Sequence, residues 1–135
     1  MSVPAAGLLD TSVFIAKESG RPIAELPGRV AVSVVTIGEL QLGVLATGDP
    51  DLRARRADTL ALARTADPRP ISEPVIVAWA RLVNDCRSAG IHRTVRLTDA
   101  LIAATAIEHG LPVITQDEDF AKIARAHPPL NVTRV

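Results

Sequence analysis

The sequence predicts an α/β protein in which helices flank a short central parallel sheet. Short apolar runs rich in β-branched residues alternate along the chain with longer helical segments. This alternation is typical of a parallel sheet covered by helices on both faces. The 135 residues are 47% hydrophobic, and neither an internal repeat nor a long linker divides them. We therefore expect a single domain over residues 1–135, built around one core.

Two strand–helix pairs are predicted in the first third of the chain. A short apolar run at residues 7–10 predicts a buried strand, and the polar residues that end it mark the start of a helix. A β-branched run at 29–34 predicts a second strand. The helix predicted over 35–46 is ended by Gly48 and Pro50.

Two further helices are predicted in the middle of the chain. One begins near Asp49 or Asp51 and ends before Pro68. The other spans 73–89, with Ser72 as its N-cap.

The last third of the chain contains a helix that is almost entirely small or apolar. Its segment LTDALIAATA has Thr98 as the expected N-cap, and Gly110 lies just past the helix end. A strand ending at Thr115, a short helix over 118–126 and a strand within 130–135 complete the predicted elements.

The overall charge and composition exclude several classes of protein. Fifteen acidic and fifteen basic residues give a net charge of zero, which excludes a strongly basic nucleic-acid binder but not a local basic patch. Aromatic residues make up only 2% of the chain, with no Tyr, so a base-stacking RNA-binding platform is not expected.

The sequence also indicates the compartment. A single cysteine, Cys86, excludes an intramolecular disulfide and fits a reducing environment. The N-terminal stretch MSVPAAGLLD lacks the basic region of a signal peptide, and no apolar run approaches the ~20 residues that span a bilayer. We expect a cytoplasmic protein with no membrane segment.

Four acids fall where this fold brings side chains together. Asp10 closes the first strand and Asp117 follows the strand VIT, while Glu39 and Asp99 lie in the first turns of helices. The carboxyl ends of parallel strands and the starts of the following helices share one edge of the sheet. The four carboxylates are therefore expected to converge.

Converging carboxylates must take up protons or bind cations. At ~4 Å and an effective dielectric constant near 20, one pair repels by about 4 kcal/mol. Oxygen ligands without His or Cys favour Mg²⁺ or Mn²⁺. Such an ion can activate water and stabilise the leaving oxygen of a phosphodiester. Asp99 taken alone could simply stabilise a helix N-terminus, which is worth about 0.3–1 kcal/mol.

Three separate motifs carry a resemblance to a known family. They are LLDTSVFIA, SVVTIGELQLG and LTDALIAATAIEHGLPVITQDEDF, in the family's order and spacing. With these motifs the chain resembles the PIN-domain nucleases, and specifically the VapC toxins of VapBC toxin–antitoxin pairs. The resemblance implies a PIN-like α/β/α sandwich, and between residues 49 and 90 it rests on pattern alone.

The resemblance assigns the catalytic and metal-binding acids. They fall on Asp10, Glu39, Asp99 and Asp117, with Asp119 as a possible further acid facing the site.

Three hydroxyl residues match small polar residues that the family places around the metal. They are Thr11, Ser12 and Thr115. The family often has Asn where Ser12 stands, but a hydroxyl can still hydrogen-bond a ligand or water.

The resemblance also implies activity and partners. The implied activity is that of a Mg²⁺-dependent (or Mn²⁺-dependent) endoribonuclease, the toxin of a type II toxin–antitoxin system, leaving 5′-phosphate and 3′-hydroxyl ends. A homodimer and a cognate VapB-type antitoxin are implied as well. Because an acidic pocket repels RNA, a basic rim must offset it, and Arg93 and Arg96 are the candidates nearest the site in sequence.

Two rival functions remain open at this point. A phosphotransfer protein would use Asp10 as its nucleophile, but the segment VITQDEDF offers no Lys, and Ser12 stands where the phosphatase pattern has a second Asp. The alternative within the same fold is a non-catalytic module that binds RNA or protein. Loss of one or more acids would mark it, and all four are present.

Overall fold

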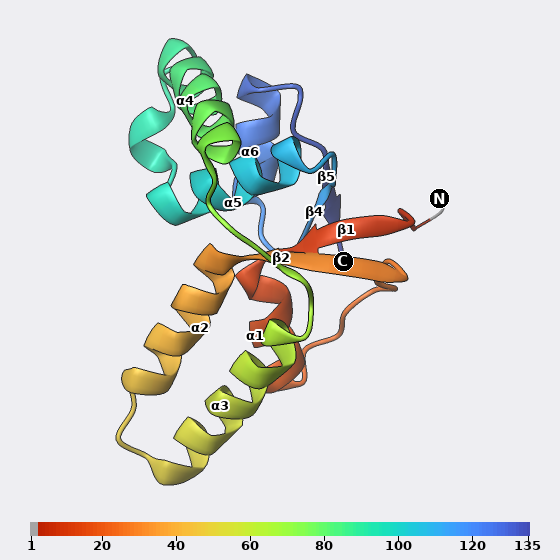
Figure 1. Cartoon of the computed structure of the whole chain (residues 1–135), viewed down its shortest axis with the longest axis vertical. Helices are drawn as coiled ribbons and strands as arrows, with labels where there is room; N and C mark the ends of the chain where they lie inside the picture. The colour runs from red at the N-terminus through yellow and green to blue at the C-terminus, as the bar shows by residue number, and fades with distance from the viewer. Residues whose placement is uncertain (1–2) are drawn as a thin grey trace.

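The computed structural model describes residues 3–135 and contains a five-stranded parallel sheet between two layers of helices (Figure 1). Met1 and Ser2, the first residues of the N-terminal stretch considered above, lie outside the described residues. The predicted α/β/α class is confirmed.

Strands and helices alternate along the chain, except at two places where one α-helix follows another with no strand between them. The first half contains β1 (Ala6–Leu9), α1 (Thr11–Ser19), β2 (Arg29–Ser33), α2 (Val34–Leu45) and α3 (Pro50–Arg64). The second half contains β3 (Pro68–Arg69), α4 (Glu73–Ser88), the 3₁₀ turn η1 (His92–Thr94), α5 (Leu97–Glu108), β4 (Val113–Thr115), α6 (Asp119–Ala126) and β5 (Val132–Arg134).

The strand order is β3-β2-β1-β4-β5, so the chain reverses its direction of travel across the sheet between β1 and β4. Leu8 pairs with Val113 and Leu9 with Ile114 in parallel register. In sheets of this kind the crevice at the carboxyl end of the reversal point is where ligands bind. The topology therefore places residue 10 and residues 115–117 at the expected position of a site.

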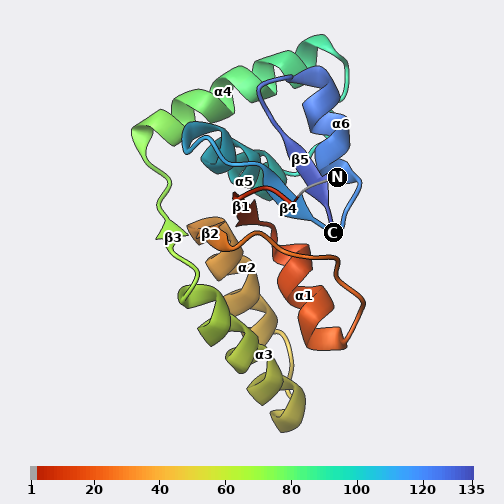
Figure 2. The same cartoon turned by 90° about the vertical axis from the view of Figure 1, so that its right-hand side faces the viewer.

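Alternating side chains of the strands divide the core into two halves. Leu8 faces a core shared with α4, α5 and α6, whereas Leu9 faces one shared with α1, α2 and α3. Figure 2 shows the same division, with α4, α5 and α6 on one side of the strands and α1, α2 and α3 on the other.

Helix α5 is the most deeply buried helix near the reversal point. Seven of its twelve residues are buried, and its small side chains, such as Ala103 and Ala106, let its backbone lie close to the sheet. This packing fixes where its first turn, with Asp99, points.

Several element boundaries differ from the predictions. The first strand ends at Leu9 rather than at Asp10, which is instead the N-cap residue of α1. Thr98 was predicted to cap α5, but the helix begins earlier and its N-cap is Arg96. The prediction failed because Leu97 and Thr98 already adopt the helical conformation, so the Thr98 hydroxyl is not placed at the helix entrance.

The two-residue strand β3 and the turn η1 were not predicted. β3 pairs with β2 through Val32–Pro68 and Ser33–Arg69. Two residues next to a proline carry no period-2 pattern, so no sequence signal distinguished this strand from a loop. In residues 3–135, no helix is both long and apolar enough to cross a membrane.

A larger side chain at position 103 tests the packing of α5. Ala103 is fully buried, so Ala103→Leu should lower the free energy of unfolding by about 1–3 kcal/mol through overpacking. Urea unfolding followed by circular dichroism measures this. Leu97→Ala on the same helix is the control, because Leu97 is 62% exposed and should change stability by less than about 0.5 kcal/mol. Equal stability of Ala103→Leu and wild type would contradict the close packing.

Candidate active site

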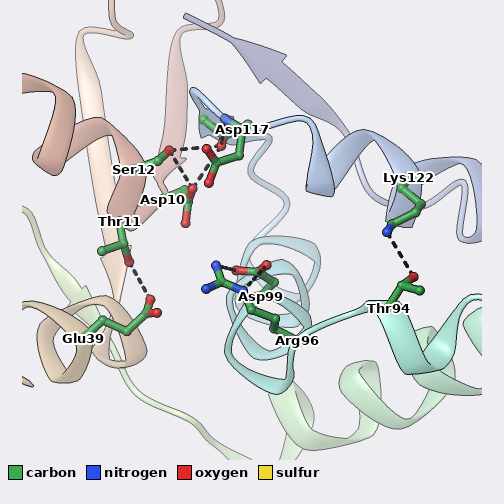
Figure 3. Close-up of polar contacts among 10 residues, drawn as sticks. Asp10, Thr11, Ser12, Glu39, Thr94, Arg96, Asp99, Asp117 and Lys122 are labelled. Carbon is green, nitrogen blue, oxygen red and sulfur yellow. Dashed lines mark hydrogen bonds and ion pairs between the residues drawn. The ribbon is translucent and has the colours of Figure 1, made fainter. Parts of the chain in front are cut away.

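The predicted acids gather at the carboxyl edge of the sheet, around the reversal between β1 and β4. Asp10 comes directly after β1, and its backbone N–H donates to the Ile114 carbonyl of β4 at 2.9 Å. Figure 3 shows Asp10, Glu39, Asp99 and Asp117 arranged around one space, each from a different segment of the chain.

Two hydroxyls hold the Asp10 carboxylate. Ser12 Oγ donates to Asp10 Oδ2 at 2.8 Å, and Thr115 Oγ1 donates to the same oxygen at 3.0 Å (Figure 3). Neither of these bonds reaches the other carboxylate oxygen, Oδ1. These two bonds fix the orientation of the Asp10 side chain.

The same two hydroxyls also accept hydrogen bonds from the segment after β4. The backbone N–H of Gln116 donates to Ser12 Oγ at 3.0 Å, and that of Asp117 donates to Thr115 Oγ1 at 2.9 Å. Because each hydroxyl has one proton, donation to Asp10 and acceptance from the backbone are compatible. Ser12 and Thr115 thus join Asp10 to the segment that carries Asp117.

Glu39 is oriented by a chain of two threonines. Thr11 Oγ1 donates to Glu39 Oε1 at 2.7 Å and lies 3.0 Å from Thr36 Oγ1. With the Thr11 proton given to Glu39, Thr36 is the donor to Thr11. Thr36 was not predicted as a site residue, and its side chain is fully buried. Its spacing of three residues before Glu39 on α2 places both on one helix face and was the available signal.

Asp99 is paired with a cation. Arg96 Nε donates to Asp99 Oδ2 at 3.1 Å, and an Nη atom of Arg96 donates to Oδ1 at 3.2 Å (Figure 3). The carboxylate side chain of Asp99 is 5% exposed, whereas that of Arg96 is 64% exposed. This ion pair was not predicted, although an Arg three residues before an Asp is a spacing at which helical side chains meet.

Burial raises the pKa of both Asp10 and Asp99. For Asp10, desolvation is the main cause, opposed by the Ser12 and Thr115 hydrogen bonds and reinforced by the negative charge of Asp99. For Asp99, desolvation again dominates; Arg96 lowers the pKa, and Asp119 and Asp117 raise it. These mutual influences place Asp10, Asp99, Asp117 and Asp119 within one electrostatic environment.

The two candidates for the fourth acid differ in exposure. Asp117 is half-buried in the segment after β4, and Asp119 is exposed at the first position of α6. Both act on Asp99, so the structure keeps both near the site.

The donor set fits a hard divalent cation. In residues 3–135 no three His, Cys, Asp or Glu side chains are already gathered closely enough to hold an ion. The groups that face one another at the sheet edge are nevertheless carboxylates and hydroxyls, which are the ligands Mg²⁺ and Mn²⁺ prefer. Asp10 is 3% exposed and its hydrogen bonds come from neutral hydroxyls, so a cation would offset the cost of its burial.

The two arginines predicted for RNA binding lie in different situations. Arg93 is exposed in η1. The Arg96 side chain is exposed, but its guanidinium is held by Asp99.

Comparison with known proteins identifies the class of fold. The family model described as "PIN domain" matches residues 7–126. This match covers most of the chain and includes all four predicted acids, so the chain belongs to the PIN-domain family.

Similar proteins of known family place the chain within it. Ribonuclease VapC8 of Mycobacterium tuberculosis is 72% identical over 100 residues, covering 74% of this chain and 89% of the relative. Ribonuclease VapC5 of the same organism is 48% identical over 124 residues, covering 90% of each. The crystal structure of VapBC-5 from M. tuberculosis, a member of the VapBC family of toxin–antitoxin systems, matches with a TM-score of 0.86 at 43% identity over 98% of this chain and 100% of that one. Within the PIN-domain family, the protein is of the VapC type.

The raised pKa of Asp10 predicts how the stability of the metal-free protein depends on pH. Because the pKa is higher in the folded state than in the unfolded chain, protonation of Asp10 stabilises the fold as the pH falls through its folded-state pKa. In EDTA at pH 7, Asp10→Asn should therefore melt at a higher temperature than wild type. The difference should shrink on acidification, as wild-type Asp10 also becomes neutral.

Calorimetry from pH 7 to pH 4 makes this comparison. Asp58→Asn is the control, because Asp58 is exposed on α3 and its replacement should have little effect. A lower melting temperature for Asp10→Asn at pH 7, or a difference independent of pH, would rule out an unfavourable buried charge at Asp10.

Proposed function

We propose that this protein is a Mg²⁺- or Mn²⁺-dependent endoribonuclease that acts as the toxin of a type II toxin–antitoxin pair. The observation that carries the proposal is the buried Asp10 carboxylate, held by two neutral hydroxyls and facing the negative charge of Asp99. Such a carboxylate calls for a cation from outside the chain. The relatives named as ribonucleases supply the substrate class.

Asp10, Asp99 and Asp117 would hold the ion, directly or through water, with Glu39 completing the shell. A bound divalent cation lowers the pKa of water and stabilises the leaving oxygen of a phosphodiester. Hydrolysis at this site would join the water oxygen to phosphorus as the bond from phosphorus to the 3′ oxygen breaks. A proton from the water would pass to the 3′ oxygen, leaving a 3′-hydroxyl and a 5′-phosphate. No nucleophile from the protein is required.

The hydroxyl residues have a positioning role in this proposal. Ser12 and Thr115 keep Asp10 in one orientation, and the Thr36–Thr11 chain does the same for Glu39. Preorganised ligands do not have to be reoriented when the ion and the RNA bind. Arg93 supplies positive charge at the rim, where a polyanion approaches the acids.

The antitoxin partner is part of the proposal. The crystal structure of VapBC-5, which matches this chain, is that of a member of the VapBC family of toxin–antitoxin systems. On α1 and α2, Ile15 is 46% exposed, Leu42 67% and Leu45 68%, and a cavity of about 330 Å³ between these helices is lined by Ile15, Glu39 and Arg56 among others. An antitoxin segment lying there would cover apolar surface and reach Glu39. We also propose that the protein forms a homodimer, because it resembles the VapC family. Light scattering on the purified protein tests this.

Mapping RNA ends in cells tests the activity. Induction of the wild-type protein should create new 5′-phosphate ends at specific sites, and induction of Asp10→Asn should not, because the ion loses a charged ligand. Sequencing of 5′ ends after induction makes the comparison, with Asp58→Asn expected to match wild type. Identical profiles for wild type and Asp10→Asn would contradict the nuclease proposal and favour the non-catalytic alternative.

Replacing Thr115 tests whether its hydroxyl holds Asp10 in the orientation that binds the metal. Thr115→Val removes the hydrogen bond to Asp10 Oδ2 and should weaken Mn²⁺ binding about 10- to 100-fold, as observed for residues that orient metal ligands. Titration followed by electron paramagnetic resonance measures free Mn²⁺. Thr65→Val on the exposed end of α3 is the control. Unchanged Mn²⁺ affinity in Thr115→Val would show that this hydroxyl does not position the ligand.

A further inference from the structure

Arg96 is the basic side chain that the structure places directly against the acids. Its guanidinium contacts both oxygens of Asp99, at 3.1 and 3.2 Å, and the charges of Glu39 and Asp119 also act on it. Although Arg96 is the N-cap residue of α5, its side chain makes no capping hydrogen bond and is 64% exposed. The long Arg96 side chain therefore places one positive charge beside several carboxylates of the candidate metal site.

We propose that Arg96 is a resident counter-ion of the acidic site, which leaves Asp99 when a divalent cation binds and then contacts an RNA phosphate. This inference rests on the proposed metal-dependent nuclease function and adds a residue that couples metal binding to substrate binding.

Geometry makes Arg96 and a metal ion competitors. Both oxygens of Asp99 accept a hydrogen bond from the guanidinium, so a metal ion bound at either oxygen would share that oxygen with a cationic donor. The positive charge of Arg96 also repels an incoming cation at the same short range. Without the metal, the pair prevents Asp99 from remaining a buried charge without a partner.

Most of the Arg96 side chain already lies in solvent, whereas Asp99 is buried. Release of Arg96 does not leave the Asp99 charge without a partner, because the incoming cation takes its place. Once free, the guanidinium stays on the rim of the site, three residues after the exposed Arg93. A planar guanidinium is suited to contact phosphate oxygens in pairs. Arg96 thus has different partners before and after the metal binds.

The first experiment measures Mn²⁺ binding to the purified full-length toxin by electron paramagnetic resonance. Arg96→Gln should bind Mn²⁺ about 3- to 10-fold more tightly than wild type, since the competing cation is gone. Arg96→Lys, which keeps the charge but cannot span both oxygens, should lie between them. Arg93→Gln is the matched control, because it removes a rim charge that is not paired with the acids, and its affinity should change less than twofold.

The second experiment observes Arg96 directly in the wild-type protein. The Nε–H signal of Arg96, assigned by its loss in Arg96→Gln, is followed by ¹⁵N NMR during titration with diamagnetic Mg²⁺. Saturation with Mg²⁺ should move the signal to the position of exposed arginines. A signal that stays at its metal-free position at saturation would overturn the proposal.

The third measurement separates the two roles of Arg96 during RNA cleavage. Arg96→Gln should lower the Mg²⁺ concentration needed for half-maximal rate and raise the KM for RNA, whereas Arg93→Gln should raise KM alone. If Arg96→Gln needed more Mg²⁺ for the half-maximal rate and also had a higher KM for RNA, the role of Arg96 would be purely structural. That result would overturn the proposal. An Mn²⁺ affinity of Arg96→Gln equal to that of wild type would also overturn the proposal.

Failure of this inference can be distinguished from failure of the proposed function. If wild type binds Mn²⁺ and Asp10→Asn does not, the metal site stands whatever Arg96→Gln shows. If wild type binds no Mn²⁺, both the metal-dependent function and the counter-ion role are contradicted.

Discussion

The two hydrogen bonds from Ser12 and Thr115 to one oxygen of Asp10 are the contact on which the site depends. They connect the start of α1 to the end of β4 across the point where the strand order reverses. The main-chain bond from Asp10 to Ile114 runs in parallel with them. Any shift of β4 relative to β1 would separate the hydroxyls from the carboxylate. The geometry of the site therefore depends on the register between β1 and β4. The packing of the helices on both faces of the sheet keeps that register in place.

The two most buried acids are compensated in different ways. Asp10 receives neutral hydroxyl donors, while Asp99 receives the guanidinium of Arg96. In both cases the pKa remains raised, because these partners do not fully replace the lost hydration. The fold thus retains an electrostatic cost at the sheet edge that its core has to offset. This pattern is expected where charged groups are kept for binding rather than for stability.

Much of this arrangement was predictable because it follows from local sequence. An apolar strand that ends in an acid specified Asp10, and the small-residue helix specified the position of Asp99 near its first turn. The sequence was less informative wherever the outcome depends on side-chain direction. Thr98 carries the residue type of an N-cap, yet the N-cap of α5 is Arg96, two residues earlier. Thr36 is not an acid, so its residue type does not mark it as part of the site. Its role becomes apparent only in the structure, where it contacts the Thr11 hydroxyl that donates to Glu39.

The position of the fourth acid shows what the structure adds to a motif. Asp117 has its backbone N–H fixed by Thr115, the residue that also holds Asp10, so it belongs to the Asp10 side of the site. Asp119 acts on both Asp99 and Arg96, and its effect on Asp99 exceeds that of Asp117. The main chain of Asp117 is thus tied to the residue that holds Asp10, while the charges of both Asp117 and Asp119 act on Asp99. The linear motif leaves the choice between the two acids open, and the structure keeps both of them near Asp99.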